Sequence, residues 1–320
     1  MSRTFTRRAV AVGVTAVLLG ASTAVANAAE PTVLIPTGKY PEAVVISPDG
    51  KKALVTSPPD ATVTVVDTAT HKVTNTIAVQ RGPFGVAFTP DGSKAYVANA
   101  YANAVSVIDM ASETMVAAPF GGDYPTSLTV SRDGSRVYVA GREAVHVLDT
   151  ATDTEVAAVK LETSAYALAT APDGTKIWAA TGSGELTAID TATNTVVDAV
   201  KTGSGGDVVL SPDGTRAYQN GGSALVVVDL IAHEVVTRVP GLQNGYRLAI
   251  SPDGSRVYAS SRASDTTQGT LAEFDTSTNT LVRKLPAGAY PYGIAVTQDG
   301  THAYVVLAGQ AALAYLDLRR

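Results

Sequence analysis

The chain has 320 residues with no cysteine, 28 glycines and 16 prolines, and 17% of its residues are charged. The lack of cysteine excludes a disulfide framework, a thiolate metal site and a cysteine nucleophile, so stability must come from a packed core, which a chain of this length can supply. The formal net charge is −5, and an acidic surface without a basic run argues against nucleic-acid binding.

The first 28 residues have the pattern of a secretory signal peptide. A head with three arginines precedes an apolar run from Ala9 to about Leu19, and Ala26-Asn27-Ala28 matches a cleavage site. The alternative is a membrane anchor, but the run is short and no basic stop follows it. Thr6-Arg7-Arg8-Ala9-Val10 also resembles a twin-arginine signal, so either export route is open. We expect a mature protein of residues 29–320, secreted or otherwise extracytoplasmic, with 21 basic and 29 acidic residues and a net charge of −8.

A Ser-Pro-Asp-Gly turn recurs through the rest of the chain. Its seven copies, some with one or two substitutions, begin at Ser47, Thr89, Ser131, Ala171, Ser211, Ser251 and Thr297. Their aspartates lie 42, 42, 40, 40, 40 and 46 residues apart. A period near 40 residues that holds across a chain indicates a repeat architecture.

One repeat unit, from Phe84 to Thr126, shows what each copy builds. Four short segments rich in strand-forming residues are separated by turns; they are Val86–Phe88, Lys94–Ala98, Val105–Asp109 and Thr114–Pro119. Four strands per unit make one propeller blade. The sequence therefore predicts an all-β fold, a seven-bladed β-propeller with four antiparallel strands per blade in a single domain.

A second turn recurs after the third strand of each unit. Its aspartates are Asp67, Asp109, Asp149, Asp190, Asp229, Asp275 and Asp317. Aspartate and threonine side chains in such turns bond the backbone, and in the first turn proline and glycine preset the chain reversal. Fourteen aspartates repeated by symmetry are therefore interpreted as structural rather than catalytic.

The two ends of the chain predict how the ring closes. The last unit stops after its third strand, whereas Pro31–Pro36 reads as a strand without its own first three partners. Pairing this N-terminal strand into the seventh blade removes an unpaired edge. We expect the loss of residues 31–36 to destabilise the fold far more than the loss of a surface loop.

The residues Tyr96-Val97-Ala98-Asn99, with Ser-Pro-Asp-Gly turns before and Val-Ile-Asp after them, closely resemble the YVTN-repeat β-propeller family. The resemblance covers about residues 31–320 and extends to the wider superfamily of lactonase-like and quinoprotein-like propellers. It implies a secreted or surface-layer bacterial protein, and a scaffold more than a reaction.

The repeated turns all lie on one face of the disc, here called the turn face. The opposite face, here called the loop-rich face, carries the links between strands two and three and between blades, which differ from blade to blade, and binding sites are grafted on such loops. The candidate ligand-binding residues there are Phe84, Tyr101, Arg142, Tyr166, Tyr246, Arg247 and Tyr292. The alternative is that the tyrosines only pack between blades. The insertion Arg262–Gly269 accounts for the 46-residue spacing between the last two first-turn aspartates. It either rims a site or is a tolerated surface loop.

Two functions remain open from the sequence. The leading hypothesis is a non-catalytic, monomeric scaffold without a cofactor that binds a protein, glycan or cell-envelope ligand. The alternative is a metal-dependent lactonase-like hydrolase or lyase, since the resemblance implies a divalent ion held by acids and asparagine at the channel mouth; Glu42 and Asp207, with Asn99, could supply these ligands. No histidine is placed on the loop-rich face, which argues against a histidine metal site or a Ser-His-Asp triad. Trp178 replaces a strand tyrosine and is expected in the core rather than under a quinone cofactor.

Overall fold

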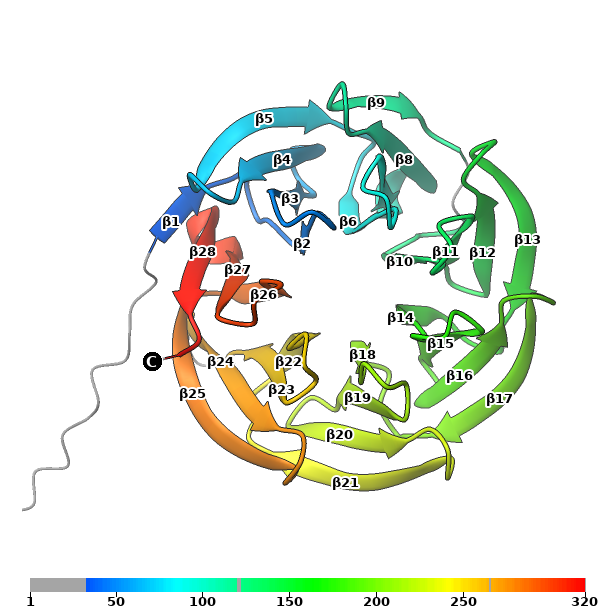
Figure 1. Ribbon diagram of the computed structural model, residues 1–320, viewed down its shortest axis with the longest axis vertical. Helices are drawn as coiled ribbons and strands as arrows, with labels where there is room; N and C mark the ends of the chain where they lie inside the picture. The colour runs from blue at the N-terminus through cyan, green and yellow to red at the C-terminus, as the bar shows by residue number, and fades with distance from the viewer. Residues whose placement is uncertain (1–32, 120–121, 265, 320) are drawn as a thin grey trace, which may run out of the picture.

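The computed structural model describes residues 33–119, 122–264 and 266–319. The expected signal peptide, residues 1–28, lies outside the described residues, as do Pro31 and Thr32 of the expected closing strand and Asp265 of the insertion. Seven four-stranded antiparallel sheets stand around a central channel (Figure 1), which confirms the predicted seven-bladed β-propeller.

The first four blades follow one another in chain order. Blade 1 consists of β2 (Val44–Ile46), β3 (Lys52–Ser57), β4 (Thr62–Asp67) and β5 (Lys72–Ala78). Blade 2 consists of β6 (Pro83–Phe88), β7 (Lys94–Asn99), β8 (Ala104–Asp109) and β9 (Thr114–Ala117). Blade 3 consists of β10 (Ser127–Val130), β11 (Arg136–Ala140), β12 (Ala144–Asp149) and β13 (Thr154–Lys160). Blade 4 consists of β14 (Ala165–Thr170), β15 (Lys176–Thr181), β16 (Glu185–Asp190) and β17 (Thr195–Lys201).

The remaining blades complete the ring. Blade 5 consists of β18 (Val208–Leu210), β19 (Arg216–Asn220), β20 (Ala224–Asp229) and β21 (Glu234–Pro240). Blade 6 consists of β22 (Gly245–Ile250), β23 (Arg256–Ser261), β24 (Gln268–Asp275) and β25 (Thr280–Ala289). Blade 7 consists of β26 (Pro291–Val296), β27 (His302–Leu307), β28 (Ala312–Asp317) and the N-terminal β1 (Val33–Pro36).

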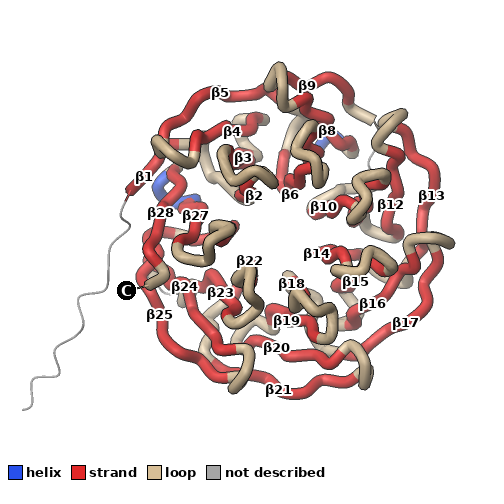
Figure 2. Tube along the Cα trace, in the orientation of Figure 1, coloured by secondary structure: helices blue, strands red, loops and turns tan. Residues whose placement is uncertain are grey.

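Turns and loops join the four strands of each blade, and the innermost strands β2, β6, β10, β14, β18, β22 and β26 surround the channel (Figure 1 and Figure 2). Two short 3-10 segments, η1 (Ala100–Ala102) and η2 (Ala308–Gln310), follow second strands. Within the described ranges, the chain forms no helix of the length and apolar character that a membrane span requires.

The repeated turns are held by their own side chains. In the first copy, Ser47 Oγ donates to Asp49 Oδ1 at 2.6 Å, the Lys51 amide donates to the same oxygen at 3.1 Å, and Gly50 adopts a φ of 74° that favours glycine. Hydrogen bonds to the carboxylate are the largest cause of a lowered pKa at all fourteen repeated aspartates. These contacts support the structural interpretation of the aspartates.

Neighbouring blades are tied together by the tyrosine of the second strand. The Tyr96 hydroxyl of blade 2 donates to Asp153 Oδ1 of blade 3 at 2.7 Å, and Lys94 Nζ lies 2.9 Å from the same carboxylate. The equivalent Tyr304 hydroxyl of blade 7 lies 3.1 Å from His71 Nδ1 of blade 1. Because both tyrosine rings are fully buried, each contact fixes the position of one blade against the next.

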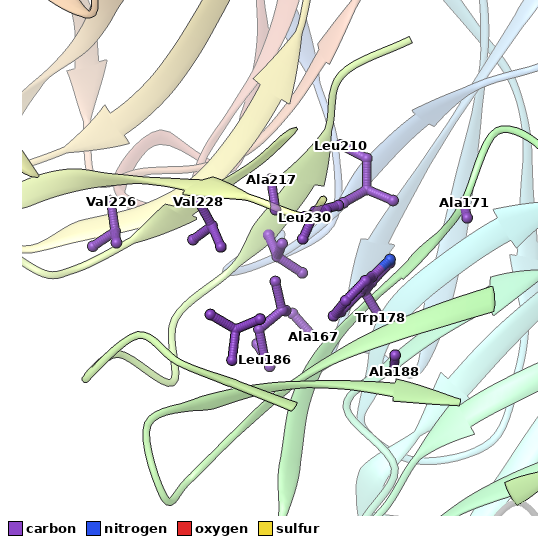
Figure 3. Close-up of a cluster of buried hydrophobic side chains, with 13 residues drawn as sticks. Ala167, Ala171, Trp178, Leu186, Ala188, Leu210, Ala217, Val226, Val228 and Leu230 are labelled. Carbon is purple, nitrogen blue, oxygen red and sulfur yellow. The ribbon is translucent and has the colours of Figure 1, made fainter. Parts of the chain in front are cut away.

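The core consists of apolar clusters between successive blades. Figure 3 shows the cluster where blade 4 meets blade 5, in which Trp178 and Leu186 lie near Leu210 and Leu230. Trp178 is buried there at the position that tyrosine holds in most other blades. This agrees with the expectation that Trp178 belongs to the core.

The ring is closed as the two chain ends predicted. Strand β1 pairs antiparallel with β28, with Ile35 opposite Leu313 and Leu34 opposite Ala314. Ile35 is 1% exposed and packs with Leu313, Val44 and Tyr304, so it joins blade 7 to blade 1, whereas Leu34 is 50% exposed. The N-terminal strand therefore buries an apolar anchor as well as covering an edge.

Candidate functional site

Three charged side chains from different blades meet at the mouth of the channel on the loop-rich face. Glu42 lies just before β2, Asp207 just before β18, and Arg247 within β22. Arg247 Nη2 is 3.4 Å from Glu42 Oε1, and Arg247 Nη1 is 3.6 Å from Asp207 Oδ1. Residues that are up to 205 positions apart in the sequence thus form one group, here called the mouth triad.

Backbone contacts hold the members of the mouth triad in place. The Leu248 amide donates to Asp207 Oδ2 at 2.8 Å, which links blade 6 to blade 5. The Gly293 amide donates to the Glu42 carbonyl at 3.0 Å, and a Cβ at Gly293 would lie 2.8 Å from that carbonyl oxygen. Only glycine allows so close an approach between blades 7 and 1. The geometry of the mouth therefore depends on the packing of four consecutive blades of the ring, blades 5, 6, 7 and 1.

The environment of the triad shifts its protonation equilibria. The side chains of Glu42, Asp207 and Arg247 are 19%, 15% and 23% exposed. Burial raises the pKa of Glu42 and of Asp207, and Arg247 opposes this shift at both carboxyls. Burial alone would lower the pKa of Arg247, but the two carboxylates raise it above its ordinary value. A perturbed cluster of this kind in a concave position is a candidate functional site.

Below the triad, the channel contains a cavity of about 160 Å³. Asp207 and Arg247 line it together with aliphatic side chains of the first strands, among them Val44, Val86 and Leu128. Asp207 and Arg247 therefore border a small cavity that polar and apolar atoms line together. Electrostatic interactions in such a setting are stronger than in water.

The first aromatic group of the mouth comes from blades 2 and 3. The rings of Phe84 and Tyr101 meet edge to face with centroids 5.8 Å apart, and the Tyr124 ring lies 5.9 Å from that of Tyr101. Arg142 places its guanidinium carbon 5.1 Å from the centroid of the Tyr124 ring. Tyr101 is 54% exposed, so this group offers ring surface to a ligand.

The second aromatic group comes from blades 6 and 7. The rings of Tyr246 and Tyr292 are 4.6 Å apart, and the guanidinium of Arg262 lies 4.4 Å from the Tyr290 ring centroid. The Tyr290 amide donates to the Thr267 carbonyl at 2.9 Å. The insertion that begins at Arg262 therefore lies against this group.

Glu42 is electrostatically close to both aromatic groups. Burial, then Tyr124 and Glu42, raises the pKa of Tyr101, and burial, then Tyr246 and Glu42, raises that of Tyr292. The carboxylate of Glu42 is thus near enough to each phenol to oppose its ionisation. The mouth triad and the two aromatic groups therefore lie in the same region of the loop-rich face.

Sequence reasoning did not single out Tyr40, Tyr124 and Tyr290 as site residues. Each has a left-handed φ, at 42°, 55° and 52°, and each immediately precedes a proline at the start of a blade. The corresponding position is Gly82 in blade 2 and Asn244 in blade 6, residue types that tolerate this conformation. A bulky residue pays a conformational cost there, so the tyrosines in three blades point to a role for their side chains.

The structure does not bring all of the expected residues together. Tyr166 is exposed on blade 4 and its ring lies against Gly182 and Gly205, without a described contact to either aromatic group. Asn99 is fully buried inside blade 2, where its Nδ2 donates to the Val97 carbonyl at 2.9 Å and to Ser106 Oγ at 3.0 Å. The Nδ2 of Asn99 is therefore committed within its own blade, whereas its buried Oδ1 has no hydrogen-bond partner among the described residues.

The metal-dependent alternative depends on Glu42 and Asp207 as ligands. The guanidinium of Arg247 already lies between these two carboxylates and neutralises part of their charge. Among the residues that the structure describes, no three His, Cys, Asp or Glu side chains are grouped so as to hold a metal ion. A divalent ion at this position would have to displace Arg247, so the donor set fits a metal poorly, and the alternative stays a prediction.

A second, larger cavity opens on the turn face. It has a volume of about 830 Å³ and is lined by the ends of the first strands and by the turn residues Pro48, Pro90, Pro172, Pro212 and Pro252. In blade 3, Arg132 takes the place of this proline. Sequence reasoning missed this cavity because the lining residues recur by symmetry and so carry no blade-specific signal.

Comparison with known proteins supports the fold and nothing finer. No protein-family model and no curated protein matches the chain. The structure is similar to a chain of hydrazine synthase from Kuenenia stuttgartiensis, with a TM-score of 0.78 and 24% identity over 92% of this chain and 98% of that chain. It is also similar to the β-propeller domain of Cps50 (Swd1) from Myceliophteria thermophila, with a TM-score of 0.77 and 14% identity over 90% of this chain and 99% of that domain. At such identities these likenesses show the propeller alone.

Proposed function

We propose that the chain is an extracytoplasmic, non-catalytic propeller of the YVTN type that binds a protein through its loop-rich face. One observation carries this proposal: two aromatic groups flank a triad of charged side chains at the channel mouth. Tyrosine and arginine are the residue types that dominate binding energy in protein interfaces, where they act as anchors in a desolvated centre. A propeller mouth with these residues is suited to seating a protruding segment of a partner.

The exposure of the aromatic residues supports binding over packing. Tyr101 is more than half exposed, and Tyr40 and Tyr166 are also exposed on the same face. The rings of Tyr101 and Tyr166 pack on one side only, and a partner that covers their exposed side would remove roughly half of the 150–250 Å² that an aromatic side chain buries. A partner would therefore bury aromatic surface that the folded chain leaves exposed on the loop-rich face.

The carboxyl groups of the two faces also differ, and the difference favours binding at the mouth. On the turn face, the repeated aspartates accept hydrogen bonds from their own turns, and those bonds lower their pKa. At the mouth, Glu42 and Asp207 have raised pKa values because burial disfavours their charged forms. Carboxylates that the fold leaves poorly solvated are the ones that a ligand can stabilise further.

The experiment compares matched variants of the two faces. The purified protein is immobilised and exposed to an envelope extract of the source cells, either untreated, protease-treated or glycosidase-treated. We expect retention of a protein from the untreated and glycosidase-treated extracts, and a loss of about tenfold or more in a Tyr101→Ser, Arg142→Ser variant, since truncating interface anchors of these types costs over about 1.4 kcal/mol.

The control is Arg132→Ser, which replaces an exposed arginine on the turn face and should leave retention unchanged. Circular dichroism would show that each variant is folded. Retention that survives the Tyr101, Arg142 change would contradict the proposal. Retention from the untreated and protease-treated extracts that is lost from the glycosidase-treated extract would replace the protein partner by a glycan.

A further inference from the structure

The mouth triad holds more negative than positive charge. Two carboxylates, Glu42 and Asp207, share the single guanidinium of Arg247, and the contacts of 3.4 and 3.6 Å are longer than the 2.7–2.9 Å that is about typical of a close charge-assisted bond. The ion pairs of the described residues give Glu42 one cationic partner, Arg247. Removing carboxylates from water is costly unless cations and donors compensate them. The triad therefore carries negative charge that a second cation would compensate.

Glu42 is the carboxylate with unused acceptor capacity. Asp207 accepts the Leu248 amide at 2.8 Å, whereas the hydrogen bonds within the described ranges give the Glu42 carboxylate a single donor, Arg247 at 3.4 Å. An ionised carboxylate can accept about four hydrogen bonds. A half-buried carboxylate with one long bond suits a ligand that brings N–H donors.

Two rings of the mouth, those of Tyr101 and Tyr292, hold no cation among the described residues. Gly293, the residue after Tyr292, bonds to the Glu42 carbonyl, and burial and, to a lesser extent, Glu42 raise the pKa of both tyrosines. Tyr124 and Tyr290 already carry the guanidinium groups of Arg142 and Arg262 over their rings, at 5.1 and 4.4 Å. In the part of the chain that the structure describes, no arginine or lysine lies over Tyr101 or Tyr292. The faces of aromatic rings attract cations, most strongly where water is excluded. These two rings can thus assist Glu42 in holding a positive group.

We propose, building on the proposed function, that the mouth takes a primary ammonium group, the side chain of a lysine on the protein partner. The ammonium donates hydrogen bonds to Glu42 and lies near the rings of Tyr101 and Tyr292. Arg262 already lies on the Tyr292 side of the mouth, with its Nη2 3.5 Å from the hydroxyl of Tyr246, whose ring is 4.6 Å from that of Tyr292. The ammonium therefore approaches from the side of Tyr101. The alkyl stem of the lysine covers the exposed ring of Tyr101, as such stems do on apolar surfaces.

The chemistry distinguishes a primary ammonium from a quaternary one. A tetramethylammonium ion has the charge for the aromatic rings but no N–H donor for Glu42, whereas a lysine ammonium has three donors. If Glu42 governs the site, the lysine group binds more tightly. If the rings alone govern it, the quaternary ion binds at least as well.

The test measures binding of three probes to the purified protein by NMR titration. The probes are Nα-acetyl-lysine methylamide, its neutral norleucine analogue and tetramethylammonium. We expect the lysine probe to bind with a Kd of about millimolar, as for a contact worth about 4 kcal/mol, more tightly than tetramethylammonium, and the norleucine analogue not to bind. Raising the salt from 0.05 to 0.5 M should weaken the lysine probe, because exposed charge pairs are screened.

Two isosteric variants locate the site. Glu42→Gln should weaken the lysine probe by about fivefold or more, which is about 1 kcal/mol. Glu162→Gln, an exposed carboxylate in the link between blades 3 and 4, should leave the affinity unchanged. Tyr101→Leu, at a residue exposed enough to tolerate the change, should weaken the lysine probe about threefold, and it serves as a second readout if Glu42→Gln alters folding.

Three results would overturn this proposal: equal binding of the lysine and norleucine probes, tighter binding of tetramethylammonium, or an affinity that neither Glu42→Gln nor Tyr101→Leu changes. The proposed function fails by a different result, the retention of the partner by the Tyr101, Arg142 variant. If binding of the partner still depends on the loop-rich face while the lysine probes fail to bind, only the assignment of a lysine is wrong and the proposed function stands.

Discussion

Replacing Arg247 with methionine is the sharpest perturbation of the mouth, because methionine keeps an unbranched apolar stem and removes the charge. Glu42 and Asp207 would lose the cation that they share, in a place where burial already raises the pKa of both carboxyls. The folded variant then takes up a proton. For a glutamate with an ordinary pKa of 4.5, holding that proton at pH 7 costs about 3 kcal/mol, at about 1.4 kcal/mol per pH unit. We expect Arg247→Met to lower the free energy of unfolding by about this amount at pH 7.

The loss should shrink in acid. The folded variant binds one proton more than the unfolded chain above the ordinary carboxyl pKa, so its stability rises as the pH falls. At pH 5 the same proton costs about 1 kcal/mol, and the difference from the wild-type protein should fall to about that value. Equilibrium urea denaturation at pH 5 and pH 7, followed by circular dichroism and by the fluorescence of the buried Trp178, measures both values.

Two further variants complete the Arg247 experiment. Arg132→Met, at an exposed arginine on the opposite face, should change the free energy of unfolding by less than about 0.5 kcal/mol at either pH. Adding Glu42→Gln to Arg247→Met removes one of the orphaned carboxylates and should recover at least about 1 kcal/mol. A loss below about 1 kcal/mol at pH 7, or an equal loss at both pH values, would refute the role of Arg247 as a counter-ion and leave only its packing.

Three more predictions concern the scaffold. Ile35→Ala should lower the free energy of unfolding by about 3 kcal/mol by leaving a cavity between the first and last blades, whereas Leu34→Ala on the exposed side of the same strand should cost less than about 1 kcal/mol; equal urea midpoints for the two would count against the closing strand as an anchor. Tyr96→Phe should lower the free energy of unfolding by about 1–2 kcal/mol because it leaves the buried side of Asp153 without its phenol donor. Thermal denaturation would detect this loss, and an unchanged melting temperature would contradict it. The turn aspartates have lowered pKa values, to about 2 at three of the first turns, so the stability that they contribute is present above their ordinary pKa of 3.8 and is lost as the pH falls toward 2; a urea midpoint that stays constant between pH 4 and pH 2 would contradict this.

The sequence predicted the fold well because symmetry repeats the same local chemistry. A turn that is written seven times at a spacing of about 40 residues leaves few alternatives for the architecture, and the unpaired ends predicted the pairing of β1 with β28. Trp178 could be placed in the core because it stands where most other units have a tyrosine. In each case, the repeat supplied an internal comparison.

The site could be predicted only in part, because it arises from contacts between blades that are distant in sequence. The face, the aromatic residues and the three charged residues of the mouth were expected, but nothing in the sequence shows that Arg247 lies between Glu42 and Asp207. Asn99 shows the limit most clearly. Sequence reasoning placed it in the loop after the second strand, but it is the last residue of β7 and its Nδ2 bonds inside blade 2.

The left-handed tyrosines had a sequence signal that could have been used. Tyr124 and Tyr290 stand before prolines at blade starts, where blade 2 has Gly82. A position that accepts glycine in one repeat and tyrosine in another is a place where the side chain is selected for something besides the turn. Such departures from the repeat consensus are the positions at which a symmetric fold carries function.

Site-specific photocrosslinking tests the central claim most directly, that the loop-rich face is the binding surface. A photoreactive phenylalanine analogue would replace either Tyr101 at the mouth or Ile231, an exposed apolar residue in a blade 5 turn on the opposite face. Irradiation in the presence of envelope proteins should join a partner to the protein labelled at position 101 and not to the one labelled at position 231. Crosslinking of the same partner from position 231, with none from position 101, would contradict the account.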